Sequence, residues 1–376
     1  MLRKHFKVKI AIKYLKENLY LYGCFFILAA FNFNNPDYAG YKEAYEMDDG
    51  RFEILFSAFI SLFSKAGFSY SVFLCFFAVL SIWQLALAIH RYTSADWKVL
   101  LLIIISPLGL LVTQIRSLMA FALLYHALGL LFDDKGMKKT ADIKYIACIV
   151  IAYGFHRIMI FYIVYLAAKR LKPVIIIIAA GIVIAVTSSL LAAPVQLREF
   201  LRNIDFIVPQ EKSLYYLTES HIRPNLNGLI ASYTLYLVAL CMVLVLLYSE
   251  FMDSKRHCSC RRGFLWFCNN TTIPAGYFFR CYLMTSIVLP FDMYDTTFER
   301  LYFYLYPFIY ILAIDRISKC SSLQNRQKVI AAVALLSLFG LFYMIYVNGN
   351  LNSIVIPLFR DNYFIQPWRW FIQGDV

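Results

Sequence analysis

Three short elements of the sequence place residues that bind anions or move protons beside long apolar runs. The stretch "QIRSLMA" puts Arg116 at the start of one run, and "FERLYFYLYP" puts Arg300 before an aromatic one. Between them, "FHRIMI" brings His156 and Arg157 together. Guanidinium groups can bind a diphosphate bidentately without a metal ion, and an imidazole can accept a proton near pH 7. An unpaired arginine in hydrocarbon costs about 3 kcal/mol or more, so these arginines should reach a membrane surface or a polar site.

The elements that must position these residues are membrane helices. Hydrophobic residues make up 61% of the 376 residues and charged residues only 16%, too few to cover a soluble protein of this size. Apolar runs such as "VIIIIAAGIVIAVTSSLLAA" are long enough to cross a bilayer. The net charge of +13 lies mostly in short segments between these runs, which favours membrane orientation over nucleic-acid binding. We therefore expect an all-α polytopic membrane protein with one integral membrane domain, residues 1–376, and no nucleic-acid partner.

The distribution of basic residues predicts the topology. The segment 1–16 carries six Lys and Arg residues and no acid, which places the N-terminus in the cytoplasm. Further basic turns, expected on the same face, lie at 133–144, 169–172, 250–263 and 315–328. Neutral or acidic segments, expected on the outer face, lie at 35–53, 195–224, 291–299 and 348–376. The large outer loop is then 195–224, and 348–376 is an outer C-terminal tail.

Apolar runs of suitable length predict nine full transmembrane helices. They lie near 17–34, 70–90, 97–113, 117–132, 173–193, 226–248, 273–290, 301–315 and 329–347. The segment 51–67 is also apolar, but it precedes the span at 70–90 too closely to cross separately, and Gly67 interrupts the two. We expect it to lie as a helix in the outer interface.

The segment 143–169 allows two interpretations. As one crossing, it places the basic turn at 169–172 outside and exports every later basic loop. As a half-membrane helical hairpin, it keeps all basic turns in the cytoplasm, and the positive-inside pattern favours this topology. Gly154, His156 and Arg157 then lie at the buried tip, where non-helical backbone requires surrounding protein or a watery cavity.

Metal and nucleotide sites find little support in the sequence. The nine cysteines form no disulfide framework, and the spacing of "HCSC" and Cys268 fits no standard zinc finger. P-loop, GxGxxG and HExxH motifs are absent. We expect no metal and no cofactor.

With this topology, the cations at the span ends and the acidic first loop share the outer face. Taken singly, each has an ordinary explanation: Arg116 or Arg300 can extend to the interface, and His156 can be an interior histidine. Their convergence instead favours a site for an anion, and a lipid diphosphate arriving from the bilayer suits guanidinium groups.

The same residues carry a resemblance to a known family. An Asp37-Tyr38 pair followed by spaced tyrosines ("NPDYAGYKEAY"), Glu53 opening an apolar helix ("RFEILF"), and the three elements above occur in order between about 30 and 310. The chain resembles the EpsG-like and Wzy-like O-antigen and exopolysaccharide polymerases of bacteria. It departs from their pattern at Ser117, where the family usually has Gln, and at Ile158, where it usually has Ser. Gln114 is a candidate to supply the hydrogen bond that a glutamine at position 117 would make.

The resemblance implies a multi-pass glycosyltransferase of the bacterial cytoplasmic (inner) membrane, with its active site facing outward. Such an enzyme transfers the growing glycan from undecaprenyl diphosphate to the non-reducing end of an incoming lipid-linked repeat. Its implied partners are the undecaprenyl-diphosphate-linked oligosaccharide, membrane lipids, and a chain-length regulator and flippase of the same pathway. The product is O-antigen, capsule or exopolysaccharide.

Roles for the site residues follow as hypotheses. Arg116 and Arg300 would stabilise the leaving diphosphate, and His156 would act as the base for the acceptor hydroxyl, with Glu53 or Asp37 in reserve. Aromatic residues such as Tyr41, Tyr45 and Trp368 either stack on sugars or anchor the interface, the latter being the more common role. The predicted substrate-binding residues are Asp37, Tyr38, Glu53, Gln114, Arg157, Arg223 and Arg360.

Two other functions are compatible with the composition. A flippase or transporter of lipid-linked oligosaccharides is expected to show an internal repeat, which the sequence lacks. An O-antigen ligase-type transferase would show a similar set of cations, and only the order of the elements favours a polymerase.

Overall fold

The computed structural model describes residues 18–48, 50–132, 139–191, 226–257, 263–264, 267–268, 274–293, 298–347, 351–362 and 364. The elements in these ranges are all helical. They cluster into two compact units. Unit 1 comprises Met1–Gly129, Lys144–Met159 and Met344–Val376, and unit 2 comprises Leu130–Ile143 and Ile160–Tyr343. The predicted N-terminal segment 1–16, the loop 195–224 and residues 365–376 of the tail lie outside the described residues.

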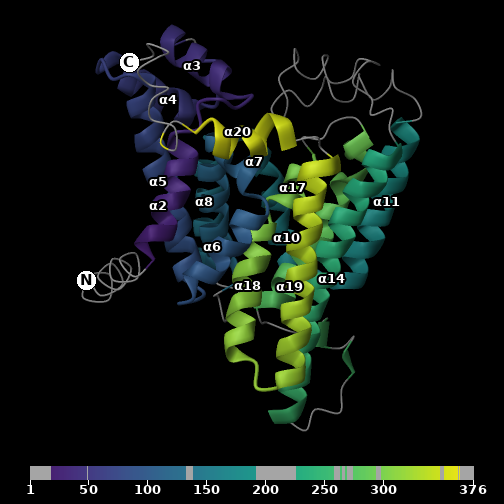
Figure 1. Cartoon of the computed structure of the whole chain (residues 1–376). Coiled ribbons are helices and arrows are strands. Elements are labelled where there is room, and N and C mark those ends of the chain that lie inside the picture. The colour runs from purple at the N-terminus through teal and green to yellow at the C-terminus, as the bar shows by residue number, and fades with distance from the viewer. Residues whose placement is uncertain are drawn as a thin grey trace. The chain divides into compact units, whose positions relative to one another are not determined.

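Unit 1 is built around α5, which contacts α2, α3, α4 and α6 (Figure 1). The elements wholly or largely in this unit are α2 (Leu19–Ala30), α3 (Tyr38–Met47), α4 (Ile54–Lys65), α5 (Tyr70–His90), α6 (Asp96–Ile105), α7 (Leu108–Thr113), α8 (Ile115–Phe132), α9 (Lys139–Tyr153), η5 (Leu351–Val355) and α20 (Ile356–Arg360). Its core is rich in aromatic rings, because Phe56, Phe73 and Phe77 are fully buried where α4 packs on α5.

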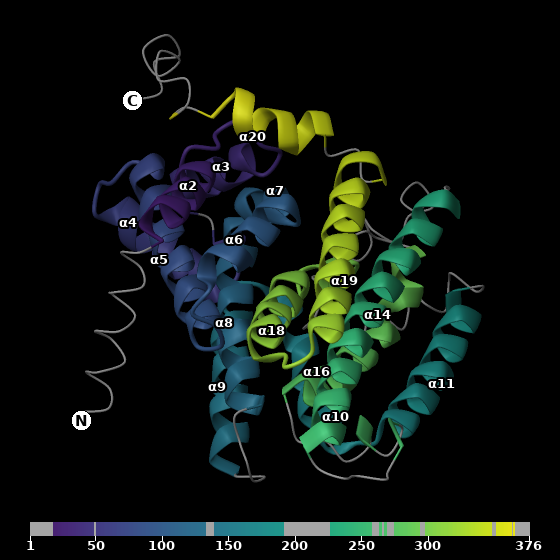
Figure 2. The same cartoon turned by 60° about the horizontal axis from the view of Figure 1, so that its bottom comes forward.

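Unit 2 is built around the long helix α14, which lies beside α19 and also contacts α16 and α18 (Figures 1 and 2). Its elements are η1 (Arg157–Val164), α10 (Tyr165–Arg170), α11 (Pro173–Leu191), α14 (Leu226–His257), α16 (Pro274–Met284), η3 (Thr285–Met293), α17 (Arg300–Phe303), α18 (Tyr306–Lys319) and α19 (Leu323–Phe342). Residues 157–159 of η1 belong to unit 1, and η4 (Tyr343–Val347) lies in unit 1 except for its first residue, Tyr343.

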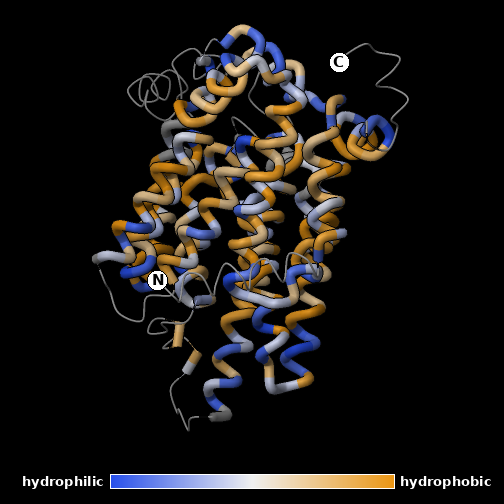
Figure 3. Tube along the Cα trace, turned by 90° about the vertical axis from the view of Figure 1, so that its left-hand side faces the viewer, coloured by the Kyte–Doolittle hydropathy of each residue, from blue (hydrophilic) through white to orange (hydrophobic). Residues whose placement is uncertain are grey.

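The helices are those of a multi-pass membrane protein. Each of the nine predicted spans coincides with one or more observed helices. Within the described ranges, four helical stretches are long and apolar enough to cross a membrane: Tyr70–His90, Ile115–Phe132, Ile230–Lys255 and Leu323–Tyr346. Hydrophobic residues extend along the helices, while hydrophilic residues gather towards their ends (Figure 3). The count of nine crossings remains a prediction.

Several predicted spans are interrupted. The segment 97–113 divides into α6 and α7 around Pro107, which has no N–H to continue the helix. The segment 273–290 changes from α16 into the 3₁₀-helix η3, which contains Pro290. The predicted helix at 51–67 is observed as α4, and Gly67 adopts a left-handed φ of 76° before α5 begins.

The segment 143–169 is broken where the hairpin prediction places its tip. Helix α9 ends at Tyr153, residues 154–156 form a turn, and η1 begins at Arg157. Residues 144–159 belong to unit 1 and the following residues to unit 2. The break is therefore confirmed, whereas the return of the chain to the same side remains a prediction.

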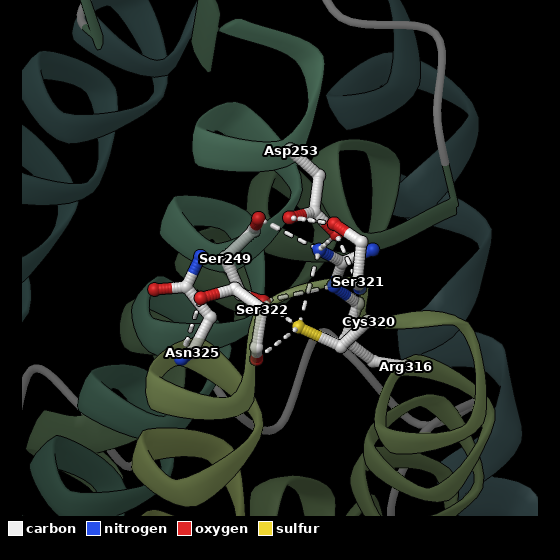
Figure 4. Close-up of polar contacts among 7 residues, drawn as sticks. All are labelled: Ser249, Asp253, Arg316, Cys320, Ser321, Ser322 and Asn325. Carbon is white, nitrogen blue, oxygen red and sulfur yellow. Dashed lines mark hydrogen bonds and ion pairs between the residues drawn. The ribbon is translucent and has the colours of Figure 1, made fainter. Parts of the chain in front are cut away.

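A buried ion pair joins α14 to α18 in unit 2 (Figure 4). Arg316 donates through Nη2 to Asp253 Oδ2 at 2.5 Å and to the Ser249 carbonyl at 2.7 Å, and through Nε to Ser249 Oγ at 2.9 Å. Asp253 also accepts a hydrogen bond from Ser321 Oγ at 3.1 Å. These contacts fasten the two helices to the turn that precedes α19.

Candidate functional site

Arg116 and Glu53 form an ion pair in unit 1. Arg116 is the second residue of α8, and Glu53 directly precedes α4. Nη1 of Arg116 donates to Oε2 of Glu53, and the two side chains are only 16% and 10% exposed. An acid beside the arginine cancels most of the charge that an apolar helix would otherwise have to carry into the membrane. This explains how "QIRSLMA" can begin a span.

Three aromatic rings enclose the guanidinium of Arg116. Its Nε donates to the Tyr41 hydroxyl at 3.1 Å, and the group lies 4.5 Å from the centre of the Phe52 ring and 5.9 Å from that of Phe56. Cation–π contacts of this kind hold a guanidinium in a fixed orientation. Nη2 has no hydrogen-bond partner among the described residues, so it can donate to a ligand.

The hydroxyl of Tyr41 stays neutral in this setting. Burial raises the pKa of the Tyr41 phenol, and the adjacent Arg116 offsets part of that rise. A neutral hydroxyl leaves Glu53 as the carboxylate that directly balances the guanidinium charge.

Glu53 also joins two of the elements that carry the family resemblance. Its Oε1 accepts the backbone N–H of Arg157 at 3.2 Å. In return, the carbonyl of Gly154 accepts the N–H groups of Leu55 at 2.9 Å and Phe56 at 3.3 Å in the first turn of α4. We call these contacts the 53–157 clasp. A Cβ at position 154 would lie 2.5 Å from Leu55 Cγ, so glycine is required for this approach.

His156 lies within the turn that the clasp fixes. Its Nδ1 accepts the backbone N–H of Ile158 at 3.3 Å, so a neutral ring carries its hydrogen on Nε2. Because residue 158 contributes its backbone, the replacement of the usual Ser by Ile does not remove this hydrogen bond.

The second departure from the family pattern is also accommodated locally. Ser117 Oγ donates to Gln114 Oε1 at 3.3 Å, and both residues are buried. Gln114 directly precedes α8, so its side chain is hydrogen-bonded to the first turn of that helix, which also carries Arg116.

The other predicted binding residues of unit 1 lie in different surroundings. Asp37 directly precedes α3, one turn ahead of Tyr41, whose N–H its carbonyl accepts at 3.0 Å. The ring of Tyr38 packs between Phe33 and Tyr70, with ring centres 5.2 and 5.3 Å away.

Arg360, at the end of α20, is the most exposed of the predicted cations that the structure describes. Its side chain is 63% exposed and pairs with the adjacent Asp361 at 2.9 Å. Asp361 in turn accepts a hydrogen bond from Asn34 at 2.8 Å. Arg223 lies outside the described residues.

Two of the aromatic residues considered for sugar stacking belong to the core. Tyr41 contacts Phe52 and Phe56, and Tyr45 contacts Tyr70 and Phe73. Both tyrosines are buried, so their rings pack on protein. Trp368 lies outside the described residues.

Arg300 belongs to unit 2, where it is the first residue of α17. Its approach to Arg116 therefore remains a prediction. Sequence reasoning missed its neighbour Glu299, which is buried and hydrogen-bonded to residues of α14 and η4. The signal was present as the acid that directly precedes Arg300 in "FERLYFYLYP".

One comparison with known proteins gives a match. A model of the EpsG family matches residues 19–359, a range that includes Glu53, Arg116, His156 and Arg300. No curated protein and no solved structure matches the chain.

Proposed function

The chain belongs to the EpsG family, a family of Wzy-like polysaccharide polymerases, and from this premise we propose its reaction. It transfers a growing glycan from undecaprenyl diphosphate to the non-reducing end of a lipid-linked repeat on the outer side of the cytoplasmic membrane. The repeat belongs to an O-antigen, a capsule or an exopolysaccharide. The reaction is proposed to need no metal, because guanidinium groups can neutralise a leaving diphosphate.

One observation carries this proposal. Glu53 contacts both Arg116 and the backbone of Arg157, so three separate elements of the family pattern meet in unit 1. A pair buried only for stability would be weak evidence for a site. Here the pair lies beside a histidine, with Nη2 of the arginine available for an anion.

The proposed step exchanges one bond for another at the anomeric carbon. An oxygen of the acceptor sugar bonds to this carbon, and the bond from the carbon to the diphosphate oxygen breaks. The electron pair of that bond leaves with undecaprenyl diphosphate. Arg116 stabilises the negative charge that develops on the leaving oxygen, and Arg300 is a second candidate for this role.

The hydrogen bond from Ile158 supports a donor role for His156. With Nδ1 occupied, the neutral ring offers an Nε2–H group that can donate to an oxygen of the leaving diphosphate. The proton of the acceptor hydroxyl then passes to a carboxylate. Asp37 is preferred because Glu53 is already paired with Arg116.

Arg116 provides the test. In a strain lacking the chromosomal copy, Arg116→Ala and Arg116→Lys should both abolish long polysaccharide and leave single lipid-linked repeats on the outer leaflet. The matched control is Arg51→Ala. Arg51 lies two residues before Glu53 and forms an exposed ion pair with Glu43, and its loss should leave the chain-length ladder unchanged. Full-length chains in Arg116→Ala cells would contradict the diphosphate assignment. Repeats retained on the cytoplasmic leaflet would instead indicate a flippase.

A further inference from the structure

Arg300 begins the shortest α-helix of the described chain. Helix α17 contains only Arg300–Phe303, and a helix of one turn is not stable by itself. Its position must therefore come from its contacts with other elements of unit 2.

Glu299, the residue before this helix, supplies the first of those contacts. It is 3% exposed, and its Oε2 accepts hydrogen bonds from Ser232 Oγ at 3.2 Å and from the Tyr343 hydroxyl. Ser232 Oγ also lies 2.7 Å from the Tyr343 hydroxyl oxygen, and its single hydrogen serves one of these two acceptors at a time. Glu299 thereby joins the start of α17 to α14 and η4.

The two residues after Arg300 are held in the same way. Tyr302 donates to Asp292 Oδ2 at 2.7 Å and to the Ser232 carbonyl at 3.3 Å. The carbonyl of Leu301 accepts the Tyr162 hydroxyl at 2.7 Å. Residues on both sides of Arg300 are thus bonded to four other elements: η1, α14, η3 and η4.

Buried hydrogen bonds to carboxyl groups restrict the positions of the elements that they join. A buried polar group that loses its partner is strongly disfavoured, and linked hydrogen bonds reinforce one another. The network therefore allows one arrangement of α17 and resists its displacement. A guanidinium that stabilises a developing charge must be fixed to within about 0.5 Å, which such a support can provide.

We propose that Glu299 and Tyr343 are positioning residues for Arg300. They act on the reaction only through the orientation of that guanidinium. This inference rests on the proposed polymerase function. It assigns a role to Glu299, the acid of "FERLYFYLYP", which has no part in the reaction proposed above.

A double-mutant cycle with purified protein and lipid-linked repeats tests the proposal. Tyr343→Phe and Glu299→Gln should each lower the polymerisation rate about tenfold in the wild-type background, the effect of losing one hydrogen bond to a charged group. In an Arg300→Lys background, where the guanidinium is absent, each should change the rate by less than about twofold.

The control is Tyr306→Phe. The Tyr306 hydroxyl is also buried in unit 2 and donates to the Leu235 carbonyl of α14 at 2.8 Å, apart from the hydrogen bonds around α17. Its loss should change the rate by less than about twofold, because it removes one neutral hydrogen bond.

Three outcomes are decisive. Equal losses in both backgrounds would show a merely structural role and overturn the inference. If the Arg300→Lys protein has no measurable activity, the equilibrium affinity for the lipid-linked repeat is measured in place of the polymerisation rate. The Tyr343→Phe and Glu299→Gln substitutions should then again have a smaller effect in the Arg300→Lys background than in the wild type. A wild-type protein that forms no polymer from these units would contradict the proposed function, whereas an active wild type with unaffected Tyr343→Phe and Glu299→Gln variants would contradict this inference alone.

Discussion

Unit 1 and unit 2 each contain an arginine that is paired with a carboxylate and largely shielded from solvent, and the two pairs differ in what surrounds them. Arg316 in unit 2 bonds to a helix carbonyl, a hydroxyl group and Asp253, which itself accepts hydrogen bonds from Ser321. Among the described residues, Arg116 in unit 1 bonds only to the side chains of Glu53 and Tyr41 and is otherwise enclosed by aromatic rings.

The difference agrees with a structural role for Arg316 and with the functional role that we propose for Arg116. The contacts of Arg316 extend to the backbone and fasten neighbouring helices, so its charge serves the packing of unit 2. The contacts of Arg116 orient the guanidinium without satisfying Nη2, and its carboxylate partner also fixes the turn that carries His156. Buried ion pairs are weak evidence for function by themselves, and the partners of each group decide its role.

The largest effect that can test this comparison is expected at Arg316. Arg316→Ala leaves Asp253 buried without its cation, which typically costs about 3–5 kcal/mol, a large share of the usual 5–15 kcal/mol stability of a folded protein. We expect little folded protein in detergent extracts and a lower melting temperature. Arg116→Ala likewise leaves Glu53 without its cation and should also lower stability. The contrast is therefore measured with Arg116→Lys, which keeps a positive charge beside Glu53 and should abolish polymerisation per molecule of folded protein.

A paired substitution sharpens the same point. Arg316→Met combined with Asp253→Leu removes both charges and should recover part of the lost stability, as apolar replacement of a buried pair often does. Abundant, stable Arg316→Ala protein without polymer would instead show that this pair also serves the reaction.

Helix positions were predictable from the sequence because a helix that crosses the bilayer needs an apolar run of a defined minimum length. The predicted span 70–90 coincides with α5, and 117–132 lies within α8. The division of 97–113 at Pro107 was not predicted, since hydropathy remains high across it. Crossing direction depends on weak charge asymmetries, so the path of 143–169 stays a prediction although its break at Gly154 is confirmed.

The sequence suggested members of the candidate site but not their contacts. Arg116, Glu53 and His156 were chosen by residue type and order, and the structure brings Arg116 and Glu53 into contact. The rings of Phe52 and Phe56 could not be assigned, because aromatic residues make up 18% of the sequence and are too frequent to be informative. The contact of the Gly154 carbonyl could not be assigned either, because a backbone group leaves no signal in the residue types. Tyr45 was grouped with surface aromatics but is buried, since tertiary packing decides which tyrosines reach the core.

A smaller effect is expected at His156, where two substitutions separate the functions of its ring nitrogens. His156→Gln keeps an N–H donor near the position of Nε2, and His156→Asn keeps an acceptor near Nδ1 for the Ile158 amide. If the ring donates to the leaving group, Gln should retain more polymerase activity than Asn or Ala, since one charge-assisted hydrogen bond is worth about tenfold in rate. Chain-length ladders from complemented cells would measure this. Equal and complete loss of polymerase activity in the Gln, Asn and Ala variants would indicate instead that the histidine acts as the base.

The smallest effect is expected at Gly154, which contributes only backbone to the site. Gly154→Ala adds a methyl group 2.5 Å from Leu55 Cγ, so the Leu55 side chain must move, and we expect this to strain the hydrogen bonds from the N–H groups of Leu55 and Phe56 to the Gly154 carbonyl. The polysaccharide chains should become shorter, which the chain-length ladder would show. The free energy of unfolding should fall by an amount on the order of 1–3 kcal/mol, which would lower the melting temperature. Leu55→Ala in the same protein removes the clashing atoms and should restore the ladder, because the displaced group is a side chain and the hydrogen bonds are backbone. A Gly154→Ala ladder that Leu55→Ala fails to rescue would show that the turn itself, and not its fit against α4, positions His156 in unit 1.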